Sequence, residues 1–130
     1  FGSAGERCMA ISVVVAVEPV ADDLIPKISE RMKQIKVGDG RRSCDMGPLV
    51  TKQHRDKVAS YIDIAASDGA EVVVDGRDVN PDGDAGGYWL GPTLIDRVPL
   101  TSKVYREEIF GPVLSVVRVA SYEEACALYS

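Results

Sequence analysis

Apolar residues follow two different periods along the chain, and these periods predict strands alternating with helices. Segment 11–17 is β-branched and apolar on both faces, which is typical of a strand covered on both sides, so we expect a central strand. In segment 20–35, apolar residues recur at steps of three and four and predict an amphipathic helix. Its apolar positions are Val20, Leu24, Ile28, Met32 and Ile35. A start near Asp22 or Asp23 would place Pro26 in the first turn, where a missing N–H costs little.

Boundary residues predict two further helices. Thr51 is a good N-cap for a helix that runs to about Asp68, with Gly69 as its stop. Ser121, followed three residues later by Glu124, forms a capping box for a last helix. The predicted apolar faces carry Val58, Ile62 and Ala65 in the first of these helices and Ala125, Leu128 and Tyr129 in the second.

Three more β-branched or apolar segments, 72–74, 93–98 and 113–119, predict strands. Segment 76–91 is rich in Asp, Gly, Asn and Pro and predicts a hairpin-like excursion at the surface. Strands that alternate with helices indicate an α/β domain, and no repeat or linker divides the chain.

The composition excludes several classes of partner. The chain has 130 residues, 45% hydrophobic and 27% charged, which are ordinary values for a globular domain. Its net charge of -5 and scattered basic residues favour neither nucleic acid nor anionic lipid. The longest apolar stretch is far shorter than the ~20 residues of a membrane helix. We therefore expect no nucleic-acid partner and no membrane partner.

The cysteines indicate free thiols. Cys8, Cys44 and Cys126 are widely and irregularly spaced, and with His54 as the single histidine they fit neither a disulfide framework nor a zinc site. We expect no metal and a reducing compartment, either the bacterial cytoplasm or a mitochondrial matrix. Core packing is the expected role of Cys126, Cys44 is interpreted as an incidental loop thiol, and His54 as solvated or linked to the helix cap rather than a general base.

Two segments carry candidate chemistry. Cys8 lies between a glycine-containing turn and segment 11–17, and a short helical turn there, together with Arg7, would favour the reactive thiolate, whereas Glu6 opposes it. A buried small hydrophobe is the alternative role for such a cysteine. Segment 107–112 presents two carboxylates, a phenylalanine and a Gly-Pro turn, which can form one wall of a ligand site. Its alternative is an exposed acidic turn whose phenylalanine fills the core.

Four motifs, in this order and at suitable intervals, resemble the aldehyde dehydrogenase superfamily over essentially the whole chain. They are FGSAGERC at 1–8, DMGPL at 45–49, GPT at 91–93 and EEIFGP at 107–112. The run RCMA at 7–10 is similar to the methylmalonate-semialdehyde dehydrogenases, the acylating members that use coenzyme A. Glu6 departs from the glutamine that most of the superfamily has at this position.

The resemblance implies that residues 1–130 are part of a Rossmann-like, three-layer α/β catalytic domain, without the dinucleotide-binding domain. It implies that Cys8 attacks a semialdehyde substrate, that NAD accepts the hydride, and that coenzyme A takes the acyl group as co-substrate. Glu108 should bind the ribose hydroxyls beside the nicotinamide, and Phe110 should pack near that ring. Arg7 should bind the substrate carboxylate through two parallel donors.

The chain begins without methionine, so we expect a fragment of a longer enzyme that is inactive in isolation. Exposed apolar surface on such a fragment predicts self-association, as a homo-oligomer. Two alternatives remain open. One is a hydrolytic aldehyde dehydrogenase with another substrate, and the other is a non-catalytic α/β module that binds a partner chain.

Overall fold

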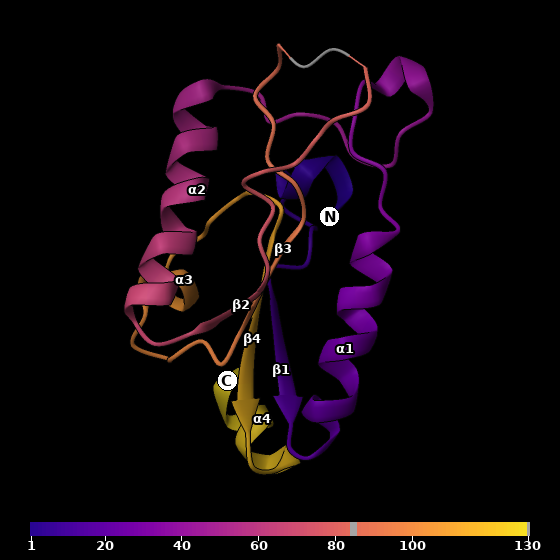
Figure 1. Ribbon diagram of the computed structural model, residues 1–130. Coiled ribbons are helices and arrows are strands. Elements are labelled where there is room, and N and C mark those ends of the chain that lie inside the picture. The colour runs from indigo at the N-terminus through magenta and orange to yellow at the C-terminus, as the bar shows by residue number, and fades with distance from the viewer. Residues whose placement is uncertain (84–85, 130) are drawn as a thin grey trace.

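A four-stranded sheet in the order β1-β4-β3-β2 organises the computed structural model, which describes residues 1–83 and 86–129 (Figure 1). The strands are β1 Val13–Val17, β2 Glu71–Val74, β3 Thr93–Asp96 and β4 Val113–Val119. β4 pairs in parallel with β1 and β3, whereas β2 and β3 pair antiparallel. The sheet is therefore mixed, with β3 and β4 at its centre.

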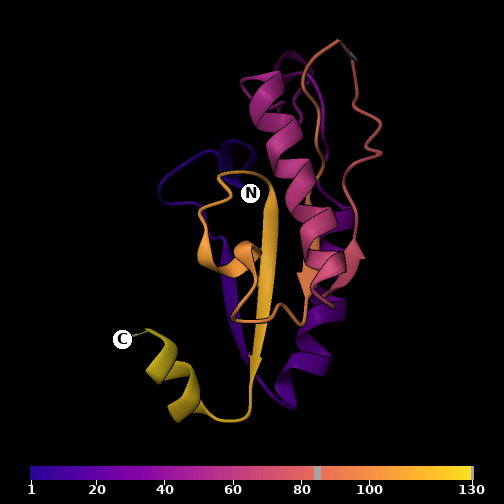
Figure 2. The same ribbon diagram turned by 90° about the vertical axis from the view of Figure 1, so that its left-hand side faces the viewer.

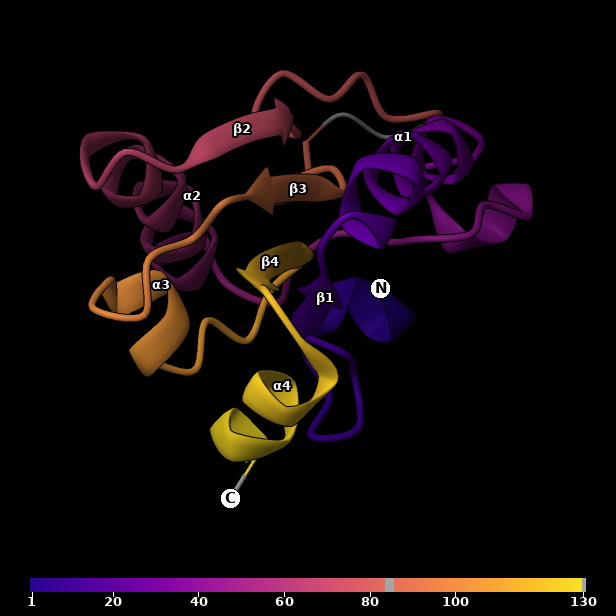
Figure 3. The same ribbon diagram turned by 90° about the horizontal axis from the view of Figure 1, so that it is seen from below.

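Helices cover both faces of this sheet, which gives three layers (Figure 3). They are α1 Val20–Lys33, α2 Lys52–Ser67, α3 Lys103–Arg106 and α4 Tyr122–Tyr129. One apolar cluster joins α1 to the face of the sheet that contains Leu94 and Val116. A larger cluster joins α2 and α3 to the opposite face, and α4 extends away from the lower end of β4 (Figure 2). The predicted α/β class and its three-layer arrangement are confirmed. Among the described residues, no helix combines the length and the apolar character needed to cross a membrane.

Local signals located several elements correctly. β4 has the predicted bounds, and the side chain of Thr51 accepts a hydrogen bond from the backbone N–H of His54 at 3.2 Å, which confirms the N-cap of α2. Gly69 ends that helix with a φ of 89°. Ser121 accepts from the N–H of Glu124, whereas the Glu124 carboxylate accepts from Ala120, one residue before the expected donor. The short helix α3, which Ser102 caps, was not predicted.

The prediction that segment 11–17 forms a central strand is wrong. Within the described residues β1 pairs only with β4, so it lies at one edge of the sheet. Its apolar residues are explained by helices, because α1 and α4 each contact β1. Cover on both faces and position within the sheet are separate properties, and an apolar run reports only the first.

Helix α1 starts earlier than predicted. The N–H of Asp22 donates to the carbonyl of Pro19 at 3.1 Å, so the first turn precedes Asp22 and Pro26 lies inside the helix rather than in its first turn. Pro26 is exposed, where water can reach the carbonyl that loses its helical donor. The predicted apolar stripe is shifted as well, because Val20 is exposed whereas Ala21, Ile25 and Met32 are buried.

The long connection between β2 and β3 is hairpin-like, as predicted, because these strands are antiparallel. Its placement wholly at the surface is wrong: Leu90 is fully buried, and Trp89 is nearly so. The guanidinium of Arg55 on α2 donates to the Trp89 carbonyl at 2.9 Å, which ties the connection to the core. Part of the predicted excursion, residues 84 and 85, lies outside the described residues.

Candidate active site

The segment that carries Cys8 contains a left-handed turn. Ser3, Ala4 and Gly5 have φ values of 53°, 55° and 74°, and Ala4 is 1% exposed. Successive residues in this region reverse the chain sharply, which carries Cys8 out of the core into a turn closed by the N–H of Ala10 on the Arg7 carbonyl at 3.1 Å. The helical turn considered for Cys8 does not form, and the thiol is exposed rather than buried.

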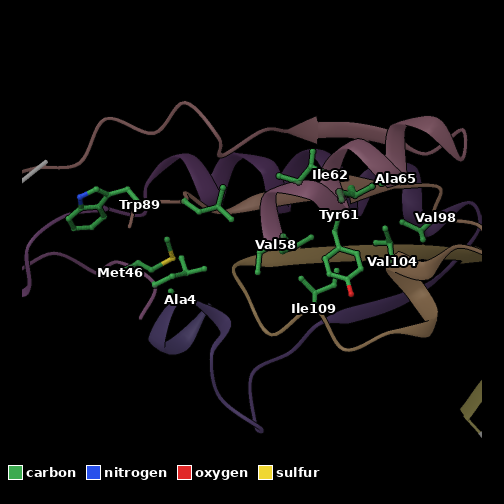
Figure 4. Packing of buried hydrophobic residues seen from close by; sticks show 14 of the residues in the cluster. Ala4, Met46, Val58, Tyr61, Ile62, Ala65, Trp89, Val98, Val104 and Ile109 are labelled. Atoms are coloured by element: carbon green, nitrogen blue, oxygen red, sulfur yellow. The ribbon is translucent and has the colours of Figure 1, made fainter. Parts of the chain in front are cut away.

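Glycines bring this segment against the turn at 107–112. A methyl group on Gly5 would overlap the carbonyl of Gly111, and a methyl group on Gly111 would lie 2.5 Å from Cγ1 of Val58 on α2. Because neither glycine has a side chain, the cysteine segment, the turn and α2 can pack directly against one another. Figure 4 shows Ala4, Val58 and Ile109 in the apolar cluster around this stack.

The stacking produces a small cavity shared by both segments. Its volume is about 80 Å³, and its lining includes Arg7, Cys8, Glu108 and Phe110. Residues that are 100 positions apart in the sequence therefore line one site. A neighbouring hollow of about 290 Å³ is also lined by Arg7, so that side chain borders both spaces.

The two carboxylates of the turn have different partners. Tyr61 on α2 donates from its hydroxyl to Glu107 at 2.5 Å, and this hydrogen bond raises the pKa of Tyr61 to about 12. Within the described part of the chain, neither the Glu108 carboxylate nor the Arg7 guanidinium has a hydrogen bond or an ion pair. Ile109, rather than the phenylalanine, fills the core, because Phe110 is 37% exposed and has a φ of 58°. Glu108 and Arg7 are thus available to a ligand.

The profile of the aldehyde dehydrogenase family matches residues 1–129. The chain belongs to this family. It is 54% identical to a malonate-semialdehyde dehydrogenase of Pseudomonas aeruginosa, over 98% of this chain and 26% of that protein. This confirms the resemblance of the four motifs to the superfamily.

Solved structures agree with this assignment. The chain matches a methylmalonate-semialdehyde dehydrogenase from Oceanimonas doudoroffii with a TM-score of 0.93 and 48% identity, over 98% of this chain and 27% of that chain. It also matches a betaine aldehyde dehydrogenase from Staphylococcus aureus in complex with NAD⁺, with a TM-score of 0.90 and 32% identity, over 97% of this chain and 25% of that chain. The chain spans about a quarter of the length of these relatives.

Glu6, the residue next to Arg7 in this aldehyde dehydrogenase chain, has a structural partner. Its carboxylate accepts a hydrogen bond from the backbone N–H of Val50 at 3.1 Å. This bond ties the cysteine segment to the loop that precedes α2. The side chain thus helps to fix the position of Cys8.

The other predicted candidates lie apart from the cavity lining. His54 is linked to the helix cap by its backbone, as predicted, but its ring nitrogen Nε2 also lies 2.6 Å from the carbonyl oxygen of Phe110. Cys44 is half-buried in its loop. The described residues contain no group of three histidine, cysteine, aspartate or glutamate side chains arranged to hold a metal ion.

The core position predicted for Cys126 is wrong, because its side chain is exposed. On α4 it is Ala125 and Leu128 that pack on the core, and Cys126 points about 100° away from Ala125 around the helix. Tyr129, also predicted on the apolar face, is 91% exposed.

Proposed function

We propose that this chain is the cysteine-bearing part of the catalytic domain of an NAD-dependent semialdehyde dehydrogenase that passes its acyl product to coenzyme A. The observation that supports the proposal is the meeting of Cys8 and Glu108 at one cavity. The names of the relatives from Pseudomonas aeruginosa and Oceanimonas doudoroffii support malonate or methylmalonate semialdehyde as the substrate. The bacterial sources of these relatives favour the bacterial cytoplasm over the mitochondrial matrix as its location.

Cys8 is the nucleophile of the proposed reaction. Its thiolate attacks the aldehyde carbon, a carbon–sulfur bond forms, and the carbonyl oxygen takes the negative charge. The exposed position of the thiol in an open turn gives the aldehyde access to it. Oxidation of the same carbon then leaves a thioester on Cys8.

Glu108 and Phe110 hold the cofactor. An unpaired carboxylate suits ribose hydroxyls, because it can accept two hydrogen bonds, and a partly exposed ring beside it suits the flat nicotinamide. When bound, NAD supplies the hydride acceptor for the oxidation. Because Cys8 lines the same cavity, these two residues would hold the hydride acceptor beside the substrate carbon bound to Cys8.

In this proposal Arg7 selects substrates that carry a carboxylate in addition to the aldehyde. A guanidinium binds a carboxylate with two parallel hydrogen bonds, and Arg7 has no competing partner within the described residues. The malonyl thioester then loses carbon dioxide and gains a proton, which leaves an acetyl thioester. The thiol of coenzyme A attacks the thioester carbon, the bond to Cys8 breaks, and the cysteine sulfur is released.

Turnover in the full-length polypeptide that contains this sequence tests the nucleophile. With malonate semialdehyde, NAD and coenzyme A we expect NADH absorbance to rise and mass spectrometry to detect acetyl-coenzyme A. Cys8→Ala should abolish both signals, whereas the control Cys126→Ala, which removes another exposed thiol, should retain them. Activity in Cys8→Ala would overturn the proposal, and malonate as the product would favour the hydrolytic alternative. The 130-residue chain alone should show no sustained turnover.

Substrate choice tests the role of Arg7. Arg7→Leu should raise KM for malonate semialdehyde about 10-fold to 100-fold, because a hydrogen bond to a charged group contributes about 1.5–3 kcal/mol. Propanal, which has no carboxylate, should keep its KM. Equal increases for both aldehydes would contradict a carboxylate-binding role.

Alkylation rates distinguish the enzyme from the non-catalytic module. Cys8 and Cys126 are both exposed, so accessibility alone predicts similar rates. Faster labelling of Cys8 by a mild alkylating agent, read by mass spectrometry, is expected of an activated thiol. Equal rates at the two cysteines would favour the interaction module.

A further inference from the structure

One face of α2 holds the turn at 107–112 at three points. His54, Val58 and Tyr61 follow one another at steps of four and three residues, so they lie on the same side of the helix. The ring of His54 meets the Phe110 carbonyl, Val58 lies against Gly111, and the hydroxyl of Tyr61 donates to Glu107. The helix therefore contacts the turn near both of its ends.

These contacts with α2 determine how the side chains of the turn are placed relative to the cavity. Glu107 is tied to Tyr61, and Ile109 is 5% exposed in the core below. Glu108 and Phe110, together with Ile109, line the cavity with Cys8, whereas Glu107 is absent from its lining. The exposed positions of Glu108 and Phe110 on either side of the buried Ile109 depend on the backbone at Phe110, which is the last residue before Gly111.

Phe110 adopts a backbone conformation that needs support. Its φ of 58° lies in the left-handed region, where a residue other than glycine persists only if its surroundings hold it there. His54 provides two such contacts: Nε2 lies 2.6 Å from the Phe110 oxygen, and the two rings meet edge to face with centroids 6.3 Å apart. Because a carbonyl can only accept, the hydrogen belongs to Nε2 of His54.

We propose that His54 is a positioning residue for the cofactor site: it holds Phe110 by its carbonyl and its ring, so that Glu108 and Phe110 face Cys8. The inference rests on the proposed function, because it assigns the consequence to NAD binding. A general-base role does not suit His54, since Nε2 is engaged with a carbonyl and the residue is absent from the cavity lining.

Three variants of the full-length polypeptide separate the contacts of His54. His54→Phe keeps a ring but removes the N–H donor, and His54→Gln keeps a donor at similar reach but removes the ring. Gln53→Ala is the matched control, an exposed neighbour in the same turn of α2. We expect His54→Phe to raise KM for NAD about 5-fold, the factor expected for one lost hydrogen bond, with a smaller change in kcat. His54→Gln should recover most of this loss, and Gln53→Ala should match the wild type.

Two further measurements separate a positioning role from general destabilisation. The alkylation rate of Cys8 should not change in His54→Phe, because the cysteine segment contacts Gly111 rather than His54. Amide hydrogen exchange across residues 107–112 should become faster in His54→Phe and return to the wild-type rate in His54→Gln.

The outcomes distinguish the two proposals. An unchanged KM for NAD in an active His54→Phe variant, or equal impairment of His54→Gln and His54→Phe, would overturn the positioning role. If the wild type does not reduce NAD, the proposed function fails, and hydrogen exchange still decides whether His54 holds the turn. Unchanged exchange at 107–112 in His54→Phe overturns the inference whatever the enzymatic result.

Discussion

A single methyl group at Gly111 tests whether close packing of three segments fixes the candidate site. Gly111 lies between Gly5 and Val58, and its φ is outside the left-handed region, so Gly111→Ala adds no backbone strain. The new methyl carbon would lie 2.5 Å from Cγ1 and 2.8 Å from Cγ2 of Val58. The effect of the substitution is therefore steric.

The size of the effect follows from these distances. Carbon atoms in contact lie about 3.5–4.0 Å apart, so the methyl group intrudes by about 1 Å. Val58 is fully buried, and the turn cannot retreat because the Gly111 carbonyl already lies against Gly5. Overpacking costs about 1–3 kcal/mol, and the reduced entropy of the unfolded chain offsets about 0.4–1 kcal/mol. We expect the free energy of unfolding to fall by about 1–2 kcal/mol.

Equilibrium urea unfolding followed by circular dichroism measures this change, and a double-mutant cycle identifies its cause. Val58→Ala removes both methyl carbons that the clash involves, so the double variant should be more stable than the sum of single effects predicts, by about 1 kcal/mol. Gly40→Ala is the control, because its methyl group would meet no atom within 4 Å. Additive effects of Gly111→Ala and Val58→Ala would refute the packing argument.

Three further predictions concern the residues around this core. Because the pKa of Tyr61 is raised, the stability that its hydroxyl contributes is present below pH 10.0 and is lost as pH rises towards about 12. Ultraviolet titration should show one tyrosine ionising late, and Tyr61→Phe should lack that phase. Arg118→Met should lower the free energy of unfolding, measured in urea, by about 3 kcal/mol, because it leaves the buried Asp96, which is 2% exposed, without its ion-pair partner. Adding Asp96→Asn to the same chain should recover part of this loss. Removing Arg118 should also return the lowered pKa of Asp22 towards its ordinary value, which NMR titration can follow. The stability that ionised Asp22 contributes through Arg118, which is lost as pH falls, should then be absent. Thr51→Ala should cost about 1 kcal/mol through the lost N-cap, whereas Thr51→Ser should retain the stability in the same assay.

The sequence by itself determined the elements whose signals are local. Thr51 and Gly69 fixed the limits of α2, because capping and chain termination involve atoms only a few residues apart. The β-branched run at 113–119 fixed β4 for the same reason. The candidate site residues came from the family resemblance of motifs, since neither their spacing nor their composition separated Cys8 from an ordinary packed thiol.

Tertiary structure alone decided the properties that depend on contacts between distant segments. The edge position of β1 depends on pairing with a strand about 100 residues later, and the exposure of Cys126 depends on how α4 lies on the sheet. Which carboxylate of the turn remains available was decided by Tyr61, 46 positions before Glu107. Periodicity describes one segment at a time, whereas these outcomes depend on which segments the whole core brings together, and no local pattern in the chain encodes that.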